Sequence, residues 1–260
     1  RGIVRYGIGV DNVDLMAAKA RGIQVCNIPD YCVDEVADHT LAFILALNRQ
    51  VARQNLLVHD GDWRLVVPPP GFRTLAGMTS GVVGFGRIGR GVVRRLIAFG
   101  GRVLVCDPAT TPKDVSAFGA EWATLATLLA ESDVITLHCP SLPETRGILN
   151  ATTLAAVRPG ALVVNLSRGD LVDTDALVAV LESGHVAGAA LDVFAPEPIP
   201  AGHPILGRPD VILAPHIASV STAAVARLRT TAAHLAVMAL RGDPLPSVVN
   251  GVASPRVVPS

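Results

Sequence analysis

The sequence has no excess of charge of either sign and few aromatic residues. Lysine plus arginine and aspartate plus glutamate number 22 each, and aromatic side chains make up 4% of the 260 residues. A chain without net charge exerts no general attraction on nucleic acid or on an anionic membrane, so we expect neither partner. On charge alone, the balance favours a soluble cytoplasmic protein. Half of the residues are apolar, which is enough for a large core in one or two domains.

Cysteine is also scarce. The four cysteines are Cys26, Cys32, Cys106 and Cys139, and their spacing contains neither a C-x-x-C pair nor a metal-binding pattern, so we expect no metal site. Cys106 and Cys139 fall in apolar runs that indicate buried strands, which favours inert core thiols. The sequence leaves a disulfide between Cys26 and Cys32 open, although the rest of the chain is typical of a reducing compartment.

No apolar run is as long as a membrane span, and no internal repeat or low-complexity tract is present. The chain opens at Arg1 without a methionine, in a segment that already has the pattern of a strand. We therefore expect it to begin within a domain, with residues missing upstream.

From about residue 80 the sequence alternates short apolar runs with amphipathic segments. The apolar runs are 81–84, 102–106, 134–139, 161–166, 187–193 and 211–214. Runs rich in valine, isoleucine and leucine without polar alternation are typical of strands buried on both faces of a parallel sheet. Helical patterns lie between them at 87–99, 125–130, 153–157 and 175–181, the last with Thr174 as a predicted N-cap. This order predicts an α/β fold with a doubly wound parallel sheet.

Two long helical patterns, 33–51 and 221–240, flank this block. Residues 1–29 contain a strand-like run, a turn and a short helix, and 61–77 is a loop or arm. We predict that 30–220 form a Rossmann domain. Residues 1–29 and the C-terminal helix and tail, 221–260, would together form part of a smaller second domain.

The first strand of the block leads into a glycine-rich turn. The segment Gly84-Phe85-Gly86-Arg87-Ile88-Gly89 is a G-x-G-x-x-G motif. A strand precedes it, a helix follows, and the next strand ends on Asp107, eighteen residues after Gly89. In dinucleotide-binding folds the three glycines permit the turn, the approach of a pyrophosphate and close helix–strand packing, while the acidic residue binds the ribose hydroxyls. The motif in this context predicts NAD binding, with NADP disfavoured by the carboxylate. An ordinary strand–turn–helix is the alternative.

Three further polar residues follow predicted strands. Arg168 could hold a carboxylate by two parallel hydrogen bonds. Glu197 lies between two prolines that stiffen its loop. His216 could exchange a proton near neutral pH, and a nearby Glu197 would hold its tautomer and favour its charged form. Each residue alone could be an ordinary surface or structural side chain. Because carboxyl ends of parallel strands meet at one edge of a sheet, the three together indicate an active site.

At this point the sequence resembles the D-isomer-specific 2-hydroxyacid dehydrogenases, in their C-terminal-binding-protein-like and glyoxylate/hydroxypyruvate reductase-like branch. The resemblance rests on ordered motifs from residue 1 to about residue 240: 6–14, 27–29, 36–38, 84–89 with Asp107, 165–170, 191–198 and 215–219. It implies that the smaller domain is a flavodoxin-like substrate domain, incomplete at its N-terminus. It also implies a homodimer, with an arm at 52–75.

The resemblance implies the following roles. Arg168 would orient the substrate, and His216 paired with Glu197 would be the general acid and base, with hydride exchanged between C2 of a small 2-hydroxy or 2-oxo acid and NAD. Ile8 and Gly9 would also bind the substrate carboxylate. Besides Arg168 and His216, the residues implied to contact the cofactor are Gly84, Gly86, Arg87, Ile88, Gly89, Asp107, His138, Cys139, Pro140, Thr145, Leu166, Ser167, Asp192 and Ala218.

Two alternatives stay open. The C-terminal-binding protein corepressors share this pattern and use NAD to control assembly with partner proteins. However, that group carries a tryptophan soon after the histidine, where this chain has Ala218-Ser219-Val220. Within the enzyme class, relatives with the same catalytic set oxidise phosphite or 3-phosphoglycerate. A phosphorylated substrate would need extra cationic side chains, and Arg5 is the obvious one near the opening loop. We therefore expect an unphosphorylated acid such as glyoxylate or hydroxypyruvate.

Overall fold

The computed structural model describes residues 2–65 and 72–253. The chain divides into two compact units. Unit 1 comprises Arg1–Glu35 with Ser219–Ser260, and unit 2 comprises Val36–Ala218. Within the described ranges, no helix is both long enough and apolar enough to cross a membrane.

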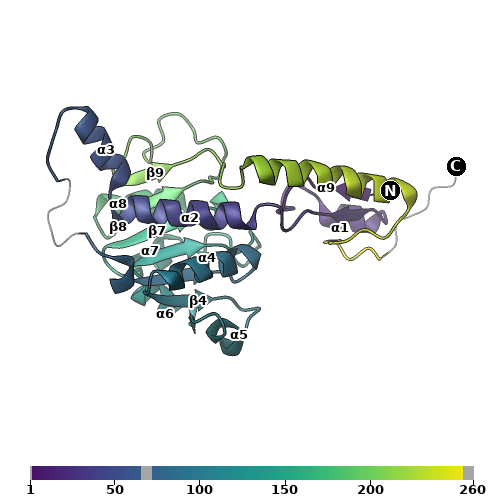
Figure 1. Ribbon diagram of the computed structural model, residues 1–260, viewed down its shortest axis with the longest axis horizontal. Helices are drawn as coiled ribbons and strands as arrows, with labels where there is room; N and C mark the ends of the chain where they lie inside the picture. Colours follow the sequence, from purple (N-terminus) through teal and green to yellow (C-terminus); the bar gives the residue numbers. More distant parts are fainter. Residues whose placement is uncertain (1, 66–71, 254–260) are drawn as a thin grey trace. The chain divides into compact units, whose positions relative to one another are not determined.

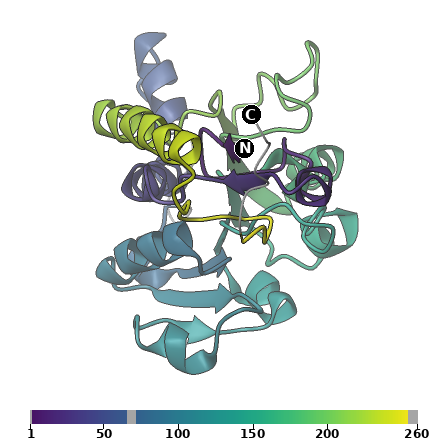
Figure 2. The same ribbon diagram turned by 90° about the vertical axis from the view of Figure 1, so that its right-hand side faces the viewer.

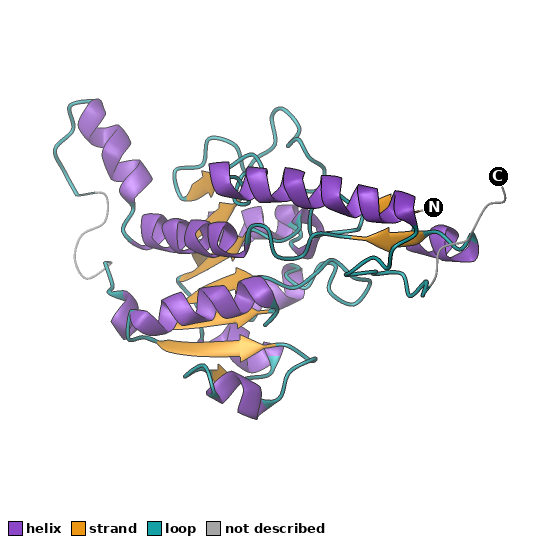
Figure 3. Cartoon of the chain, turned by 45° about the vertical axis from the view of Figure 1, so that its right-hand side comes forward, coloured by secondary structure: helices purple, strands orange, loops and turns teal. Residues whose placement is uncertain are grey.

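Within its described residues, unit 2 forms a seven-stranded parallel sheet in the order β5-β4-β3-β6-β7-β8-β9 (Figure 3). The strands are β3 (Thr79–Val83), β4 (Arg102–Cys106), β5 (Glu121–Trp122), β6 (Val134–Leu137), β7 (Ala161–Asn165), β8 (Val186–Leu191) and β9 (Val211–Leu213). The chain runs outward from β3 to β5 and then continues from β6, beside β3, to β9 at the other edge. The predicted doubly wound sheet is therefore confirmed. The reversal between β3 and β6 is the point where such sheets bind ligands, outside the carboxyl ends of the strands.

Helices cover both faces of this sheet. The helices between residues 33 and 182 are α2 (Val33–Asn48), α3 (Val51–His59), α4 (Arg87–Ala98), α5 (Pro112–Ser116), α6 (Leu125–Glu131), α7 (Ala151–Ala155) and α8 (Thr174–Glu182), with 3-10 turns η1 (Leu75–Gly77) and η2 (Gly169–Leu171). Helix α3 buries none of its residues and does not cover the sheet. Leu128 of α6, Leu154 of α7 and Leu177 of α8 are fully buried in one apolar cluster with the strands. Figure 2 shows α2 and α4 on the opposite side of the sheet.

Several predicted boundaries were wrong. The pattern 33–51 is not one helix: α2 ends at Asn48, and α3 begins at Val51. The break lies at Gln50, which adopts a left-handed backbone (φ 53°) and whose amide donates to the carbonyl of Leu47. The strand predicted over 134–139 ends at Leu137.

Helix caps account for two further differences. The N-cap of α8 is Asp173, not Thr174, and its carboxylate accepts the Ala176 N–H at 3.0 Å. Helix α7 begins at Ala151, two residues before the predicted start, because Asn150 caps it and accepts the backbone N–H groups of Thr152 and Thr153. Short elements such as α5 and β5 bury too few apolar residues to leave a periodic pattern, and the sequence did not predict them.

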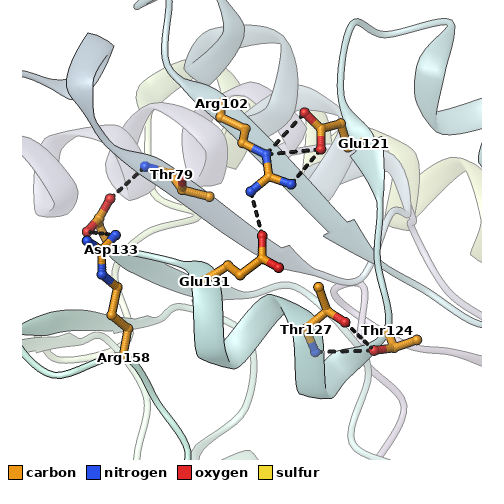
Figure 4. Close-up of polar contacts among 8 residues, drawn as sticks. All are labelled: Thr79, Arg102, Glu121, Thr124, Thr127, Glu131, Asp133 and Arg158. Atoms are coloured by element: carbon orange, nitrogen blue, oxygen red, sulfur yellow. Dashed lines mark hydrogen bonds and ion pairs between the residues drawn. The ribbon is translucent and has the colours of Figure 1, made fainter.

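The amino ends of the central strands are joined by Asp133, which precedes β6 and is only 3% exposed. One carboxylate oxygen accepts the N–H of Thr79, the first residue of β3, at 2.8 Å. The other receives the guanidinium groups of Arg73 at 2.5 Å and Arg158 at 2.7 Å. Figure 4 shows Asp133 with Thr79 and Arg158, and beside them Arg102 of β4 bridging Glu121 and Glu131. These charges hold the sheet at the edge opposite the predicted site.

Unit 1 is built on a small parallel sheet. Strand β1 (Gly2–Val4) pairs with β2 (Gln24–Cys26), α1 (Leu15–Ala20) lies between them in sequence, and α9 (Thr222–Arg241) completes the unit. Figure 1 marks α1 and α9 in the ribbon. Ser221 caps α9 by accepting the Ala224 N–H at 2.9 Å. All four cysteines have free thiols, so the open question of a Cys26–Cys32 disulfide is answered against it.

Candidate active site

The glycine-rich turn between β3 and α4 has the close contacts that its motif requires. Gly84 has φ +98°, and a Cβ there would lie 2.5 Å from the backbone nitrogen of Cys139. A Cβ on Gly89 would lie 2.1 Å from the carbonyl oxygen of Gly84. At Gly86, in contrast, a Cβ would meet no protein atom within 4 Å. Close contacts within the protein therefore account for the glycines at positions 84 and 89. The space beside Gly86 is open for a ligand.

Helix α4 begins directly after this turn, and its N-cap Gly86 provides no side-chain cap. The first N–H groups of a helix have no partner within the helix, so those of Arg87 and Ile88 can bind an anion. Asp107, at the end of β4, is fixed beside the turn. Its two carboxylate oxygens accept the N–H of Phe85 at 2.6 Å and of Ala109 at 2.7 Å.

The loop after β6 lies opposite the glycine-rich turn, where the strand order reverses between β3 and β6. The His138 N–H donates to the carbonyl of Val83 at 2.7 Å, and the imidazole Nε2 lies 2.9 Å from the Thr136 hydroxyl. Desolvation by burial lowers the pKa of His138 to about 3, so the ring is neutral at physiological pH. Burial raises the pKa of the Cys139 thiol to about 11, which excludes a thiolate there. The Thr145 hydroxyl closes the loop by donating to the carbonyl of Pro140 at 2.6 Å.

Arg168 follows β7, and the segment that carries it is held by Asn165, which is only 1% exposed. The Asn165 amide nitrogen donates to the carbonyl of Arg168 at 2.7 Å, and its amide oxygen accepts the Ser167 N–H at 3.0 Å. The Ser167 hydroxyl donates to the carbonyl of Cys139 at 2.6 Å, which joins this loop to the one after β6. Leu166 is buried at the base of the segment.

Glu197 and His216 lie together. The imidazole Nδ1 of His216 is 2.9 Å from Oε2 of Glu197, and Oε1 of Glu197 accepts the N–H of Phe194 at 2.9 Å. One carboxylate oxygen is thus fixed by the backbone while the other orients the imidazole. The His216 side chain is 48% exposed and that of Glu197 is 39% exposed, so Nε2 of the histidine can meet a ligand.

Asp192, at the end of β8, holds the loop on which His216 lies. It is 1% exposed, and its carboxylate oxygens accept the N–H groups of Ile217 and Ala218, each at 2.8 Å. Its carbonyl accepts the His216 N–H at 2.8 Å. The family resemblance implies a cofactor contact for Asp192, whereas this anchoring contact was not predicted from the sequence. The cofactor role stays a prediction.

A pocket of about 540 Å³ adjoins the Glu197–His216 pair. The rest of its lining is apolar: Phe194, Pro198, Ile199, Leu206, Leu213, Ala214 and Pro215. No lysine or arginine is among these residues, all of which belong to unit 2. The pocket could not be predicted from the sequence, because its walls come from separate segments: the one between β8 and β9, the end of β9, and the residues that follow β9.

The structure thus brings most of the predicted site residues to the carboxyl edge of one sheet. Ile8 and Gly9 belong to unit 1, where the Asn27 amide donates to the carbonyl of Ile8 at 2.7 Å, and their substrate role stays a prediction. Across the described part of the chain, no group of three or more histidine, cysteine, aspartate or glutamate side chains is arranged to hold a metal ion.

Comparison with known proteins identifies the family. The model of the D-isomer specific 2-hydroxyacid dehydrogenase NAD binding domain matches residues 41–218, and the chain belongs to this family. Unit 2 is accordingly an NAD-binding domain.

Three relatives illustrate the range of similarity. A D-3-phosphoglycerate dehydrogenase of Mycobacterium bovis is 38% identical over 99% of this chain and 49% of its own length. A glyoxylate reductase of Thermofilum pendens is 38% identical over 95% of this chain and 74% of its own. A crystal structure of D-lactate dehydrogenase from Aquifex aeolicus, complexed with NAD and lactic acid, has a TM-score of 0.87 and 32% identity, and covers 100% of this chain and 81% of that one. The chain spans about half the length of the phosphoglycerate dehydrogenases that it matches.

Proposed function

We propose that the protein is an NAD-dependent oxidoreductase acting at C2 of a small 2-hydroxy or 2-oxo acid. The observation that carries this proposal is the Glu197–His216 pair. Its 2.9 Å contact orients an imidazole that is open on the other side, at the carboxyl edge of an NAD-binding sheet. A proton donor and acceptor in that position is what interconversion of a carbonyl and an alcohol requires.

The four residues of the proposed site have different roles. His216 gives a proton to the carbonyl oxygen in reduction and removes it from the hydroxyl in oxidation. Glu197 holds the imidazole and stabilises its positive charge. Arg168 binds the substrate carboxylate, for which a guanidinium is suited by its parallel donors. Asp192 keeps His216 in place through Ile217 and Ala218.

The residues present fit NAD. The open space at Gly86 and the free N–H groups at the start of α4 suit a pyrophosphate, and the fixed carboxylate of Asp107 suits ribose hydroxyls. A 2′-phosphate would be repelled by that carboxylate, so NAD is preferred over NADP. When bound, NAD supplies the acceptor or donor of the hydride.

The proposed substrate is an unphosphorylated acid of the glyoxylate or hydroxypyruvate type. Relatives with the same overall identity carry the names of phosphoglycerate dehydrogenase and of glyoxylate reductase, so identity alone does not choose between them. The pocket beside His216 supports the smaller acid, because its lining contains neither lysine nor arginine to neutralise a phosphate. Arg168, which lies outside this lining, would bind the carboxylate.

The test is a turnover assay of the natural full-length protein with a panel of 2-oxo acids. We expect oxidation of NADH by glyoxylate or hydroxypyruvate, with a higher kcat/KM for NADH than for NADPH. Higher efficiency with phosphohydroxypyruvate would overturn the substrate class, and higher efficiency with NADPH would overturn the cofactor preference. NADH binding without turnover of any 2-oxo acid, or of phosphite and NAD, would favour an NAD-sensing binding protein instead.

We also propose that the protein is a homodimer and that α3 contributes to the interface. Helix α3 has no buried residue, and apolar side chains on it and after it are exposed: Val51, Leu56, Val58, Trp63 and Leu65. An exposed apolar surface of this kind is typical of a binding face. The predicted arm, 52–75, extends over residues 66–71, which lie outside the described residues.

Substitution of Trp63, which is 88% exposed, tests this interface. We expect light scattering to give the mass of a dimer for the wild type and a larger monomer fraction for Trp63→Glu. Met16→Glu, a charge introduced at a 76% exposed side chain of α1, is the matched control and should leave the mass unchanged. A monomeric wild type would contradict the proposal.

A further inference from the structure

The loops that carry Arg168 and Glu197 are in backbone contact at Gly169. A Cβ on Gly169 would lie 1.9 Å from the carbonyl carbon of Phe194, 2.1 Å from its oxygen and 2.5 Å from the nitrogen of Ala195. All three atoms are backbone atoms, which cannot rotate away as the end of a side chain could. The φ of Gly169 is not in the left-handed region, so any residue could adopt its conformation. Glycine is therefore required at position 169 because the two backbones approach closely, and not because of its backbone conformation.

The contact joins two parts of the proposed catalytic set. Arg168 is the residue before Gly169, and its carbonyl is held by the amide of Asn165. On the other side, the N–H of Phe194 fixes Glu197, which in turn orients His216. A displacement at Phe194 is therefore transmitted to the carboxylate and then to the imidazole.

We propose that Gly169 is a positioning residue, which sets the separation between the guanidinium of Arg168 and the Glu197–His216 pair by allowing the two loops to touch. This inference rests on the proposed function. A methyl group at this point would have to move one loop by more than about 1 Å, and misplacement of that size can cost about 100-fold in rate. Movement of either loop would change the separation between Arg168 and the Glu197–His216 pair, because each loop carries part of the catalytic set.

The glycine-rich turn and Asp107, which would bind the pyrophosphate and the ribose, are held by contacts that do not involve Gly169. The turn at Gly84–Gly89 packs against His138 and Cys139, and Asp107 is held by Phe85 and Ala109. Gly169→Ala should therefore separate catalysis from cofactor affinity, which general destabilisation of the domain would not do.

The experiment compares the wild type, Gly169→Ala and Gly77→Ala in the natural full-length protein. Gly77 is the matched control: a Cβ there meets only the Thr74 hydroxyl, at an ordinary 3.6 Å, and its φ is not in the left-handed region. Turnover is measured with the 2-oxo acid that the wild type reduces, and the Kd of NADH is measured by fluorescence. For Gly169→Ala we expect kcat to fall by about 100-fold, KM for the acid to rise, and the NADH Kd to stay within about twofold.

A double-mutant cycle with Glu197→Gln adds a readout that a purely structural role would not change. If Gly169 acts through the Glu197–His216 geometry, Gly169→Ala should cost much less in the Glu197→Gln background than in the wild type. Wild-type turnover by Gly169→Ala, additive effects in the cycle, or parallel loss of NADH binding and turnover would each overturn the inference. A wild type that reduces no 2-oxo acid would overturn the proposed function first, and this inference with it.

Discussion

Replacement of His216 by glutamine is expected to lower kcat for reduction of the 2-oxo acid by about 10²–10⁴-fold, the usual contribution of a general acid. Glutamine keeps polarity and approximate size but cannot exchange a proton near neutral pH. The loop should stay in place, because Asp192 holds it through backbone N–H groups and not through the imidazole. NADH affinity should therefore change little, and steady-state kinetics with fluorescence titration would measure both quantities.

Two companion variants make this prediction specific. Glu197→Gln should also lower kcat, but by less than His216→Gln, because the imidazole remains and loses only the charge that stabilises it. His234→Gln on α9, an exposed histidine outside the site, should have wild-type kinetics. If His216→Gln kept most of the wild-type kcat, the proton would have to come from another group and the proposed mechanism would be wrong.

The second large effect is expected at the glycine-rich turn, where two similar substitutions should have different consequences. Gly86→Ala should leave the stability of the protein within about 0.5 kcal/mol of the wild type, because a Cβ there meets no protein atom within 4 Å. It should nevertheless weaken NADH binding by about tenfold or more, since the methyl group occupies space that the cofactor needs. Gly89→Ala should lower both stability and affinity, because its Cβ would lie 2.1 Å from the carbonyl oxygen of Gly84.

Thermal unfolding and NADH titration of both variants would check this pair, with Gly77→Ala as the common control. The informative outcome is the behaviour of Gly86→Ala. Wild-type NADH affinity in that variant would mean that the cofactor does not pass over Gly86, and the cofactor site would have to be placed elsewhere on the sheet.

The parallel sheet and the family could be predicted from the sequence because their signals are local. Strands buried on both faces, such as Ala161–Asn165, leave an uninterrupted apolar run, and the turn at Gly84–Gly89 is contiguous. The break at Gln50 left no such signal. Its left-handed backbone is stabilised by a hydrogen bond to Leu47, while the apolar pattern continues through it.

The three candidate catalytic residues could be proposed because each lies within a few residues after the end of a predicted strand. The contacts that organise them could not. Gly169 and Phe194 are far apart in the sequence, and nothing in either segment specifies that their backbones touch. Likewise, the anchoring role of Asp192 depends on where the segment after β9 returns. The sequence therefore indicated which groups are available for chemistry, but not how their relative positions are maintained.

The position of Asp133 has a consequence for how such a protein can change over time. It joins β3, β6 and β7 through Thr79, Leu162 and the two arginines, at the sheet edge farthest from His216. Contacts at the amino ends of the strands thereby stabilise the sheet, while the loops at the carboxyl ends determine which ligand is bound. Substitution of an exposed pocket side chain between β8 and β9, such as Leu206, should therefore alter substrate preference with little effect on folding. The scaffold is thus suited to acquiring new specificities through changes in its pocket side chains.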